Sequence, residues 1–249
     1  VVRGLRWQAL LYHSDVGLLS ATTAVLVGQV VNTGLPIARS GDFARAVWAN
    51  QRESVGISNA LGAIVLEKVL DLLALCATGL VLLVVLPLPE WFTRSTWILA
   101  VAVGLGLIVL YLGLHWQRTL VRWVGILLKR LPSKVGRFVM PQLEQLVAAL
   151  NAARQPSASL GAGLWTLANW GLGAVANWAV MRAFGIASWP AALFLLATLM
   201  LGGAAVPTPG RIGVFEGICV VSLAQFGVDS NLALAVGFVL HLVVLAPAL

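Results

Sequence analysis

The sequence is poor in the residues that usually carry chemistry. Of its 249 residues only 10% are charged, 3 are histidine and 2 are cysteine. An average soluble domain carries about 25% charged residues. Cys76 and Cys219 lie in apolar segments without the spacing of metal ligands, so we interpret them as small helix-packing residues. Nothing resembles a nucleotide-binding loop or a nucleophile–base pair, so the sequence predicts no catalytic residue, metal or cofactor.

Long apolar runs dominate what is present. Hydrophobic residues make up 60% of the chain, and the mean hydropathy is +0.95. The runs lie near residues 71–86, 97–114, 160–184, 190–206 and 232–249. Each approaches the ~20 residues that a helix needs to cross a bilayer. The first run belongs to a helical pattern over residues 56–86, and residues 87–95 after it are predicted to form a short external loop. The sequence therefore predicts an all-α polytopic membrane protein.

The net charge of +7 is concentrated in the middle of the chain. Residues 118–154 hold seven of the 16 lysines and arginines and a single acid, Glu144. This clustering is typical of a cytoplasmic segment rather than of a nucleic-acid-binding surface. Residues 117–131 and 138–153 also have the pattern of amphipathic helices. We therefore predict an inner-membrane protein with a first transmembrane repeat (1–116), a basic cytoplasmic linker (117–156) and a second transmembrane repeat (157–249).

The N-terminal segment allows two topologies. Arg3, Arg6 and Trp7 have the composition of an interfacial flank, and the apolar residues 16–31 that follow are basic on both sides. A simple span would leave one basic flank outside, whereas a re-entrant hairpin turning near Pro36 keeps both flanks inside. We favour the hairpin.

Two stretches combine proline and glycine and cannot continue a helix. The backbone breaks are attributed to Pro36 and Gly41 within residues 34–45, and to Pro207, Pro209, Gly210 and Gly213 within residues 206–217. Each stretch contains the pattern R-x-G-x-F, beginning at Arg39 or Arg211, and each precedes a long apolar helix. The span count makes the first enter from the cytoplasm and the second from outside. This arrangement predicts two inverted repeats, each with a re-entrant broken-helix hairpin.

Three motifs in order resemble the lysylphosphatidylglycerol synthase/flippase transmembrane family. They are N-x-x-x-P-x-x-R-x-G-D-x-x-R from Asn32 to Arg45, E-K-V-L-D from Glu67 to Asp71, and P-T-P-G-x-x-G-V-F-E from Pro207 to Glu216. The resemblance covers nearly the whole chain and implies movement of aminoacylated or glycosylated lipids between leaflets. The chain departs from the family at Arg211, where members commonly have glycine.

The acidic residues of the second motif allow two interpretations. Glu67 and Asp71 are four residues apart and project from one helix face. A charge at the bilayer centre costs at least ~2.5–3.5 kcal/mol, which favours a functional cavity. The alternative places Glu67 near the interface as a structural partner of Arg39 or Arg45. Lys68 is expected to serve as a counter-ion to Asp42 or Glu216.

The candidate site residues are those that could hold a lipid headgroup. They are Asn32, Arg39, Asp42, Arg45, Glu67, Asp71, Arg211 and Glu216. The guanidinium groups of Arg39, Arg45 and Arg211 suit a phosphate, because they can bind it with two hydrogen bonds. His241 is expected to be a hydrogen-bonded structural residue, with proton sensing as the alternative.

The sequence favours a lipid flippase whose partners are membrane lipids, without nucleic acid. The alternatives are the membrane part of a lipid-modifying synthase or glycosyltransferase, and a scaffold that transports nothing. A homo-oligomer and a fused or partner synthase domain are both compatible with the sequence.

Overall fold

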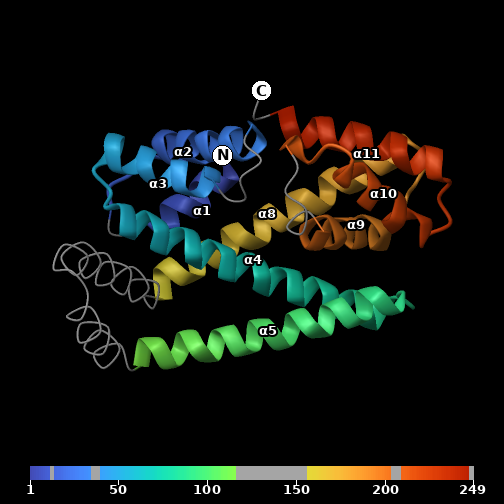
Figure 1. Ribbon diagram of the computed structural model, residues 1–249, viewed down its shortest axis with the longest axis horizontal. Coiled ribbons are helices and arrows are strands. Elements are labelled where there is room, and N and C mark those ends of the chain that lie inside the picture. The colour runs from blue at the N-terminus through green and yellow to red at the C-terminus, as the bar shows by residue number, and fades with distance from the viewer. Residues whose placement is uncertain (12–13, 35–39, 116–155, 203–208, 247–249) are drawn as a thin grey trace.

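The structure is a computed structural model that describes residues 1–11, 14–34, 40–115, 156–202 and 209–246. All regular elements within these residues are helices (Figure 1). They are α1 (Val2–Leu10), α2 (Leu18–Gly34), α3 (Ser40–Glu53), α4 (Ile57–Val85), α5 (Glu90–His115), α8 (Pro156–Ala183), α9 (Trp189–Gly202), the 3-10 turn η1 (Pro209–Arg211), α10 (Val214–Ala224) and α11 (Ser230–Leu245). The prediction of an all-α protein is confirmed for this part of the chain.

The helices form two groups that meet along a central seam. Helices α1–α3 lie together on one side and α9–α11 on the other, while α4 and α8 run diagonally across the middle (Figure 1). Helix α8 packs against α1 of the first group, against α9 and α11 of the second, and against the other central helix, α4. The turn η1 contacts α2. Segments far apart in the sequence therefore enclose the seam.

The surface is apolar, and several charges are buried. Val84 is 88% exposed and Leu19 81%, whereas Arg6 is only 1% exposed. Helices α4 and α5 are long and apolar enough to cross a bilayer, and α2, α9, α10 and α11 are apolar but shorter. A soluble protein would reverse this distribution, because charged side chains are then almost never fully buried and apolar ones usually are. The molecule has the surface of a membrane protein.

Helix boundaries follow capping as well as hydropathy. The helix predicted from residue 56 to 86 is confirmed as α4 (Ile57–Val85). The loop predicted over residues 87–95 is wrong from Glu90 onward, because α5 begins there. The carbonyl of Pro89 accepts hydrogen bonds from the N–H groups of Phe92 and Thr93, and the acidic Glu90 lies in the first turn. An acid at a helix N-terminus is favourable, so polar residues there extend the helix.

Both backbone breaks are shorter than predicted. Helix α3 begins at Ser40 and α10 at Val214, so Gly41 is helical rather than part of a break. The Gly41 N–H donates to the side-chain oxygen of Asn32 at 2.8 Å, which satisfies a donor that a helix start leaves free. Pro36, Pro207 and the predicted linker lie outside the described residues, so the hairpin turns and the cytoplasmic section stay predictions.

Gly41 permits close packing of α2 on α3. A Cβ atom there would collide with the carbonyl oxygen of Gly28 and approach the Asn32 side chain to 2.6 Å. We expect Gly41→Ala to force α2 and α3 apart and to lower stability by about 1–3 kcal/mol, measured by thermal unfolding in detergent. The matched control is Gly163→Ala on α8, where a Cβ would meet nothing within 4 Å. If both variants unfold at the same temperature, the close-packing argument is wrong.

Candidate functional site

A buried ion-pair network joins α1, α3 and α4. Arg6 donates from Nη2 to Glu67 Oε1 at 2.6 Å and from Nη1 to Asp71 Oδ1 at 2.6 Å. Arg45 Nη2 donates to the other oxygen of Glu67, Oε2, also at 2.6 Å. Since Glu67 and Asp71 lie one turn apart on α4, a single guanidinium reaches both carboxylates. The network ties the first helix to two later ones.

Arg6 and Trp7 have the composition of an interfacial flank, but their side chains lie inside the protein and not on its surface. Arg6 is 1% exposed and Trp7 is fully buried. The indole ring of Trp7 lies under the Arg45 guanidinium, whose Cζ is 4.8 Å from the ring centroid, as a cation–π contact. Charge balance could have predicted the buried position of Arg6. Two acids on one buried helix face need a second cation besides Arg45, and Arg6 is that cation.

A second polar cluster links the backbone turn to α10 and α11. Glu216 Oε1 lies 2.6 Å from His241 Nδ1, and Glu216 Oε2 accepts the N–H of Gly213 at 2.7 Å. His241 Nε2 lies 2.7 Å from the carbonyl oxygen of Gly210. Gly210 and Gly213 have φ values of 61° and 82°, a backbone region that glycine enters without steric cost. The expectation of a hydrogen-bonded structural His241 is confirmed.

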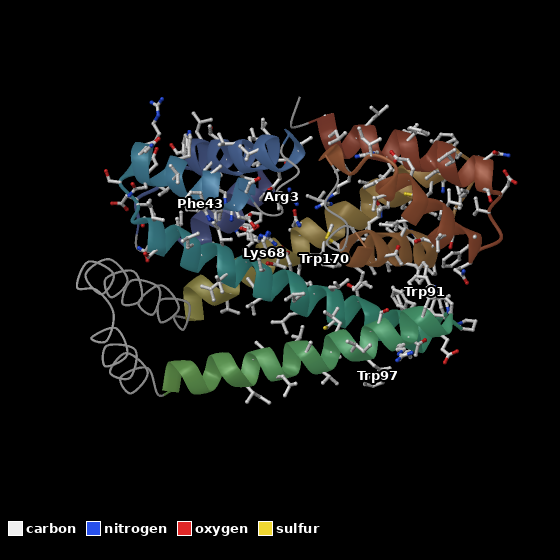
Figure 2. The ribbon with its side chains drawn as sticks, viewed as in Figure 1. Arg3, Phe43, Lys68, Trp91, Trp97 and Trp170 are labelled. Atoms are coloured by element: carbon white, nitrogen blue, oxygen red, sulfur yellow. The ribbon has the colours of Figure 1, made fainter. Side chains whose placement is uncertain are left out.

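A cavity of about 250 Å³ lies between the two clusters. Its walls come from α1–α4, from the end of α9, from η1 and from α10 and α11. Arg3 and Lys68 lie near this seam, whereas Trp91 and Trp97 lie on α5, away from it (Figure 2). Charged groups of both halves of the chain thus face one space.

The structure brings most of the predicted site residues together. Those that line the cavity are Asn32, Asp42, Arg45, Glu67, Asp71 and Arg211. Glu216 is buried behind the wall, where it contacts the lining residue His241. Arg39 lies outside the described residues. Arg3 and His241 also line the cavity and were not among the predicted site residues.

Two of the predicted partners are observed. Lys68 Nζ lies 3.6 Å from Asp42 Oδ2, which confirms Asp42 as its counter-ion. Arg45 pairs with Glu67, as the structural interpretation of that acid expected. Glu67 also lines the cavity, so a functional role for it stays a prediction. Glu67 occupies the Nη2 of Arg45, and the Nε of Arg45 is buried, so little of this guanidinium is accessible to a phosphate.

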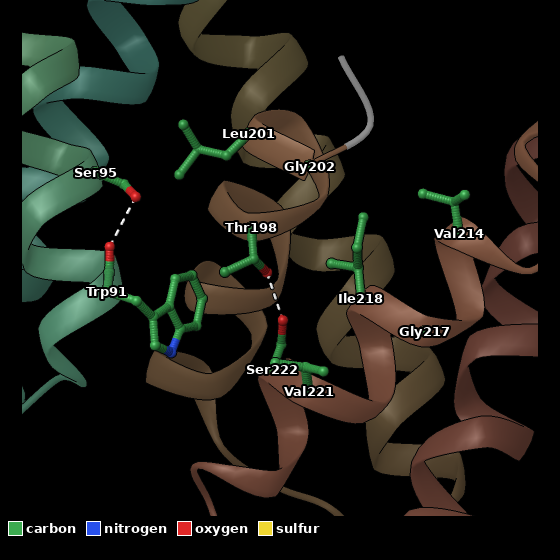
Figure 3. Close-up of a pocket in the computed structure, with 10 residues that line it drawn as sticks. All are labelled: Trp91, Ser95, Thr198, Leu201, Gly202, Val214, Gly217, Ile218, Val221 and Ser222. Carbon is green, nitrogen blue, oxygen red and sulfur yellow. Dashed lines mark hydrogen bonds between the residues drawn. The ribbon is translucent and has the colours of Figure 1, made fainter. Parts of the chain in front are cut away.

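A second, larger cavity lies between α5 and the α9–α10 pair (Figure 3). Its volume is about 540 Å³, and aromatic, aliphatic and glycine residues dominate its walls. The hydroxyl of Ser222 donates to that of Thr198 at 2.7 Å, and Ser95 donates to the Trp91 carbonyl at 2.7 Å. Because these hydroxyls already have partners, the pocket suits hydrocarbon better than a charged group.

The chain was also compared with known proteins. A family model described as the lysylphosphatidylglycerol synthase TM region matches residues 1–249, the whole chain. The chain belongs to this family. The resemblance found in the three sequence motifs is thereby confirmed. No curated protein and no solved structure gave a match.

Family membership assigns the chain to a class of membrane domain. The lysylphosphatidylglycerol synthase transmembrane family suggests a relation to lipid synthesis or lipid flipping, and the catalytic activity of the synthase lies in another domain. Function within a family depends on the site, so the substrate has to be argued from the cavity.

Proposed function

We propose that this chain is a lipid flippase domain that moves an anionic, aminoacylated or glycosylated lipid between leaflets. The observation that carries the proposal is the polar cavity at the seam. Both halves of the chain line this cavity, although the outer surface of the protein is apolar. Buried charge in a membrane domain is costly and is typical of a substrate pathway. The headgroup would enter the cavity while the acyl chains remain in the surrounding lipid.

Two parallel features support an inverted-repeat arrangement. In the first half, α3 after the break is linked to the next helix, α4, by Arg45 and Glu67. In the second half, α10 after the break is linked to α11 by Glu216 and His241. Interrupted segments at matching positions of two repeats are a common location of transport sites. In this proposal the basic residues 117–156 face the cytoplasm of a bacterial-type inner membrane.

The function is tested by blocking the cavity. The chain is reconstituted in vesicles containing acyl-labelled fluorescent phosphatidylglycerol, and a membrane-impermeant reductant reports how fast inner-leaflet label becomes accessible. Thr33→Trp adds bulk to the cavity wall on α2, and we expect it to reduce the rate to that of protein-free vesicles. Val30→Trp adds the same bulk where the side chain is 49% exposed, and should leave the rate unchanged.

Three outcomes contradict the proposal. They are a wild-type rate no faster than that of protein-free vesicles, equal rates for wild type and Thr33→Trp, and equal inhibition by the two tryptophan substitutions. The second candidate, the membrane part of a lipid-modifying synthase, is favoured by the synthase named in the family description. A chain that moves no lipid but forms a stable complex with a soluble synthase domain would support that alternative.

A further inference from the structure

The carboxylates that line the cavity are already neutralised. They are Asp42, Glu67 and Asp71. The cations paired with them are Lys68, Arg45 and Arg6, at distances of 3.6, 2.6 and 2.6 Å. Three negative and three positive charges therefore cancel, and none of these cations has charge left over for a ligand.

The cluster of Glu216 and His241 contributes no net charge either. The carbonyl of Gly210 can only accept a hydrogen bond, so His241 Nε2, 2.7 Å away, carries a proton. The 2.6 Å contact between His241 Nδ1 and Glu216 Oε1 needs a second proton, on one atom or the other. The pair is then either an imidazolium with a carboxylate or a neutral histidine with a carboxylic acid. Both states have a total charge of zero.

Two lining cations remain without a partner acid. Arg3 on α1 and Arg211 in η1 line the cavity from opposite halves of the chain. No carboxylate in the described part of the protein forms an ion pair with either of them. Both side chains are exposed and therefore accessible to a ligand. The cavity thus has a surplus of two positive charges among its described residues.

The backbone at Arg211 does not explain an arginine there. Its φ is 59°, in the left-handed region. Such a conformation is unfavourable for an L-residue, and glycine adopts it without this cost. Strained positions of this kind concentrate at binding sites. The side chain of Arg211 is therefore better explained by a ligand than by the fold.

We propose that Arg3 and Arg211 together bind a lipid headgroup that carries about two negative charges, such as a terminal phosphate monoester. A phosphate monoester carries about −1.5 to −2 at neutral pH, and guanidinium groups bind phosphate oxygens with paired hydrogen bonds. The positive surplus disfavours a headgroup with a net positive charge, such as a lysyl ester of phosphatidylglycerol. This inference rests on the proposed function, because it takes the cavity to be a headgroup site, and it selects the class of lipid.

Binding to three lipids of different charge tests the proposal. The purified chain is placed in phosphatidylcholine nanodiscs, and its affinity is measured for phosphatidic acid, phosphatidylglycerol and lysylphosphatidylglycerol. We expect affinity to fall in that order. A charge-assisted hydrogen bond contributes about 1.5–3 kcal/mol, so the double variant Arg3→Gln/Arg211→Gln should weaken phosphatidic acid binding by at least about tenfold.

Two further variants separate binding from folding. Arg182→Gln removes an exposed charge that lies over the Trp178 ring and not in the cavity, and should leave all three affinities unchanged. Arg211→Gly removes the charge and the backbone strain together, so we expect weaker phosphatidic acid binding with an equal or higher unfolding temperature. A lower unfolding temperature for Arg211→Gly would contradict the strain argument.

The outcomes distinguish this inference from the proposed function. Equal affinity for the three lipids, or unchanged binding in the double variant, overturns the inference even if the chain moves lipids. Selective phosphatidic acid binding without any lipid transport supports the inference and overturns the flippase proposal. The affinity for glycerol 3-phosphate, a soluble phosphate monoester, is measured last. If it equals the affinity for phosphatidic acid, the site does not select a lipid.

Discussion

Replacing Glu67 with glutamine is expected to lower the stability of the protein by about 3–5 kcal/mol, because it leaves a buried ion pair without one partner. Glu67 accepts hydrogen bonds from both Arg6 and Arg45 and is 6% exposed. With Glu67 neutral, Asp71 alone remains to balance two buried guanidinium groups. The measurement is thermal unfolding in detergent, together with the yield of folded protein.

A compensated variant keeps this prediction testable if Glu67→Gln fails to fold. Replacing a whole buried pair by apolar residues of similar size is often neutral. We therefore expect Glu67→Leu combined with Arg45→Met to recover most of the lost stability, while Arg6 keeps its bond to Asp71. The matched control is Glu90→Gln, at an exposed position in the first turn of α5. If the double variant is as unstable as Glu67→Gln, uncompensated charge is not the cause.

Replacing Glu216 with alanine is expected to cost about 3 kcal/mol, because it leaves two buried hydrogen-bonding groups without their partner. The carboxylate holds His241 on α11 and also accepts the N–H of Gly213 at the start of α10. Its loss leaves the 5% exposed His241 with one unsatisfied nitrogen and frees the first turn of α10. The unfolding midpoint should fall clearly below that of Glu90→Ala, which removes an exposed carboxylate.

Glu216→Gln should be the milder substitution. Its amide oxygen can still accept from Gly213, and its amide group can still bond to a neutral His241. The expected order of stability is wild type, then Glu216→Gln, then Glu216→Ala. Equal losses for the two variants would mean that the carboxylate acts through its volume and not through its hydrogen bonds.

The charge count also sets a limit on what family membership implies. The family description names a synthase of a lipid with a cationic headgroup. The described cavity residues carry a surplus of positive charge, which repels such a headgroup and attracts an anionic one. The departure at Arg211, visible in the sequence, therefore alters the substrate that we propose.

Much of the architecture follows from the sequence alone. Hydropathy and helical periodicity are local properties, so they predicted the all-α class and the bounds of α4 to within one residue. The i, i+4 spacing placed Glu67 and Asp71 on one face, and the glycine–proline stretch marked the turn around Gly210. Three ordered motifs were enough to identify the family. Each of these inferences uses residues that are near one another in the chain.

Only the tertiary structure decided which charges are available to a ligand. Arg6 has the composition of a membrane flank, yet the packing of α1 near α4 carries it to an acid 61 residues away. Arg45 looked like a phosphate ligand and is instead neutralised by Glu67. Arg3 and Arg211 line the cavity from opposite halves of the chain, and no acid of the described residues pairs with them. Whether a charge is paired depends on contacts between distant helices, and local pattern does not encode those contacts.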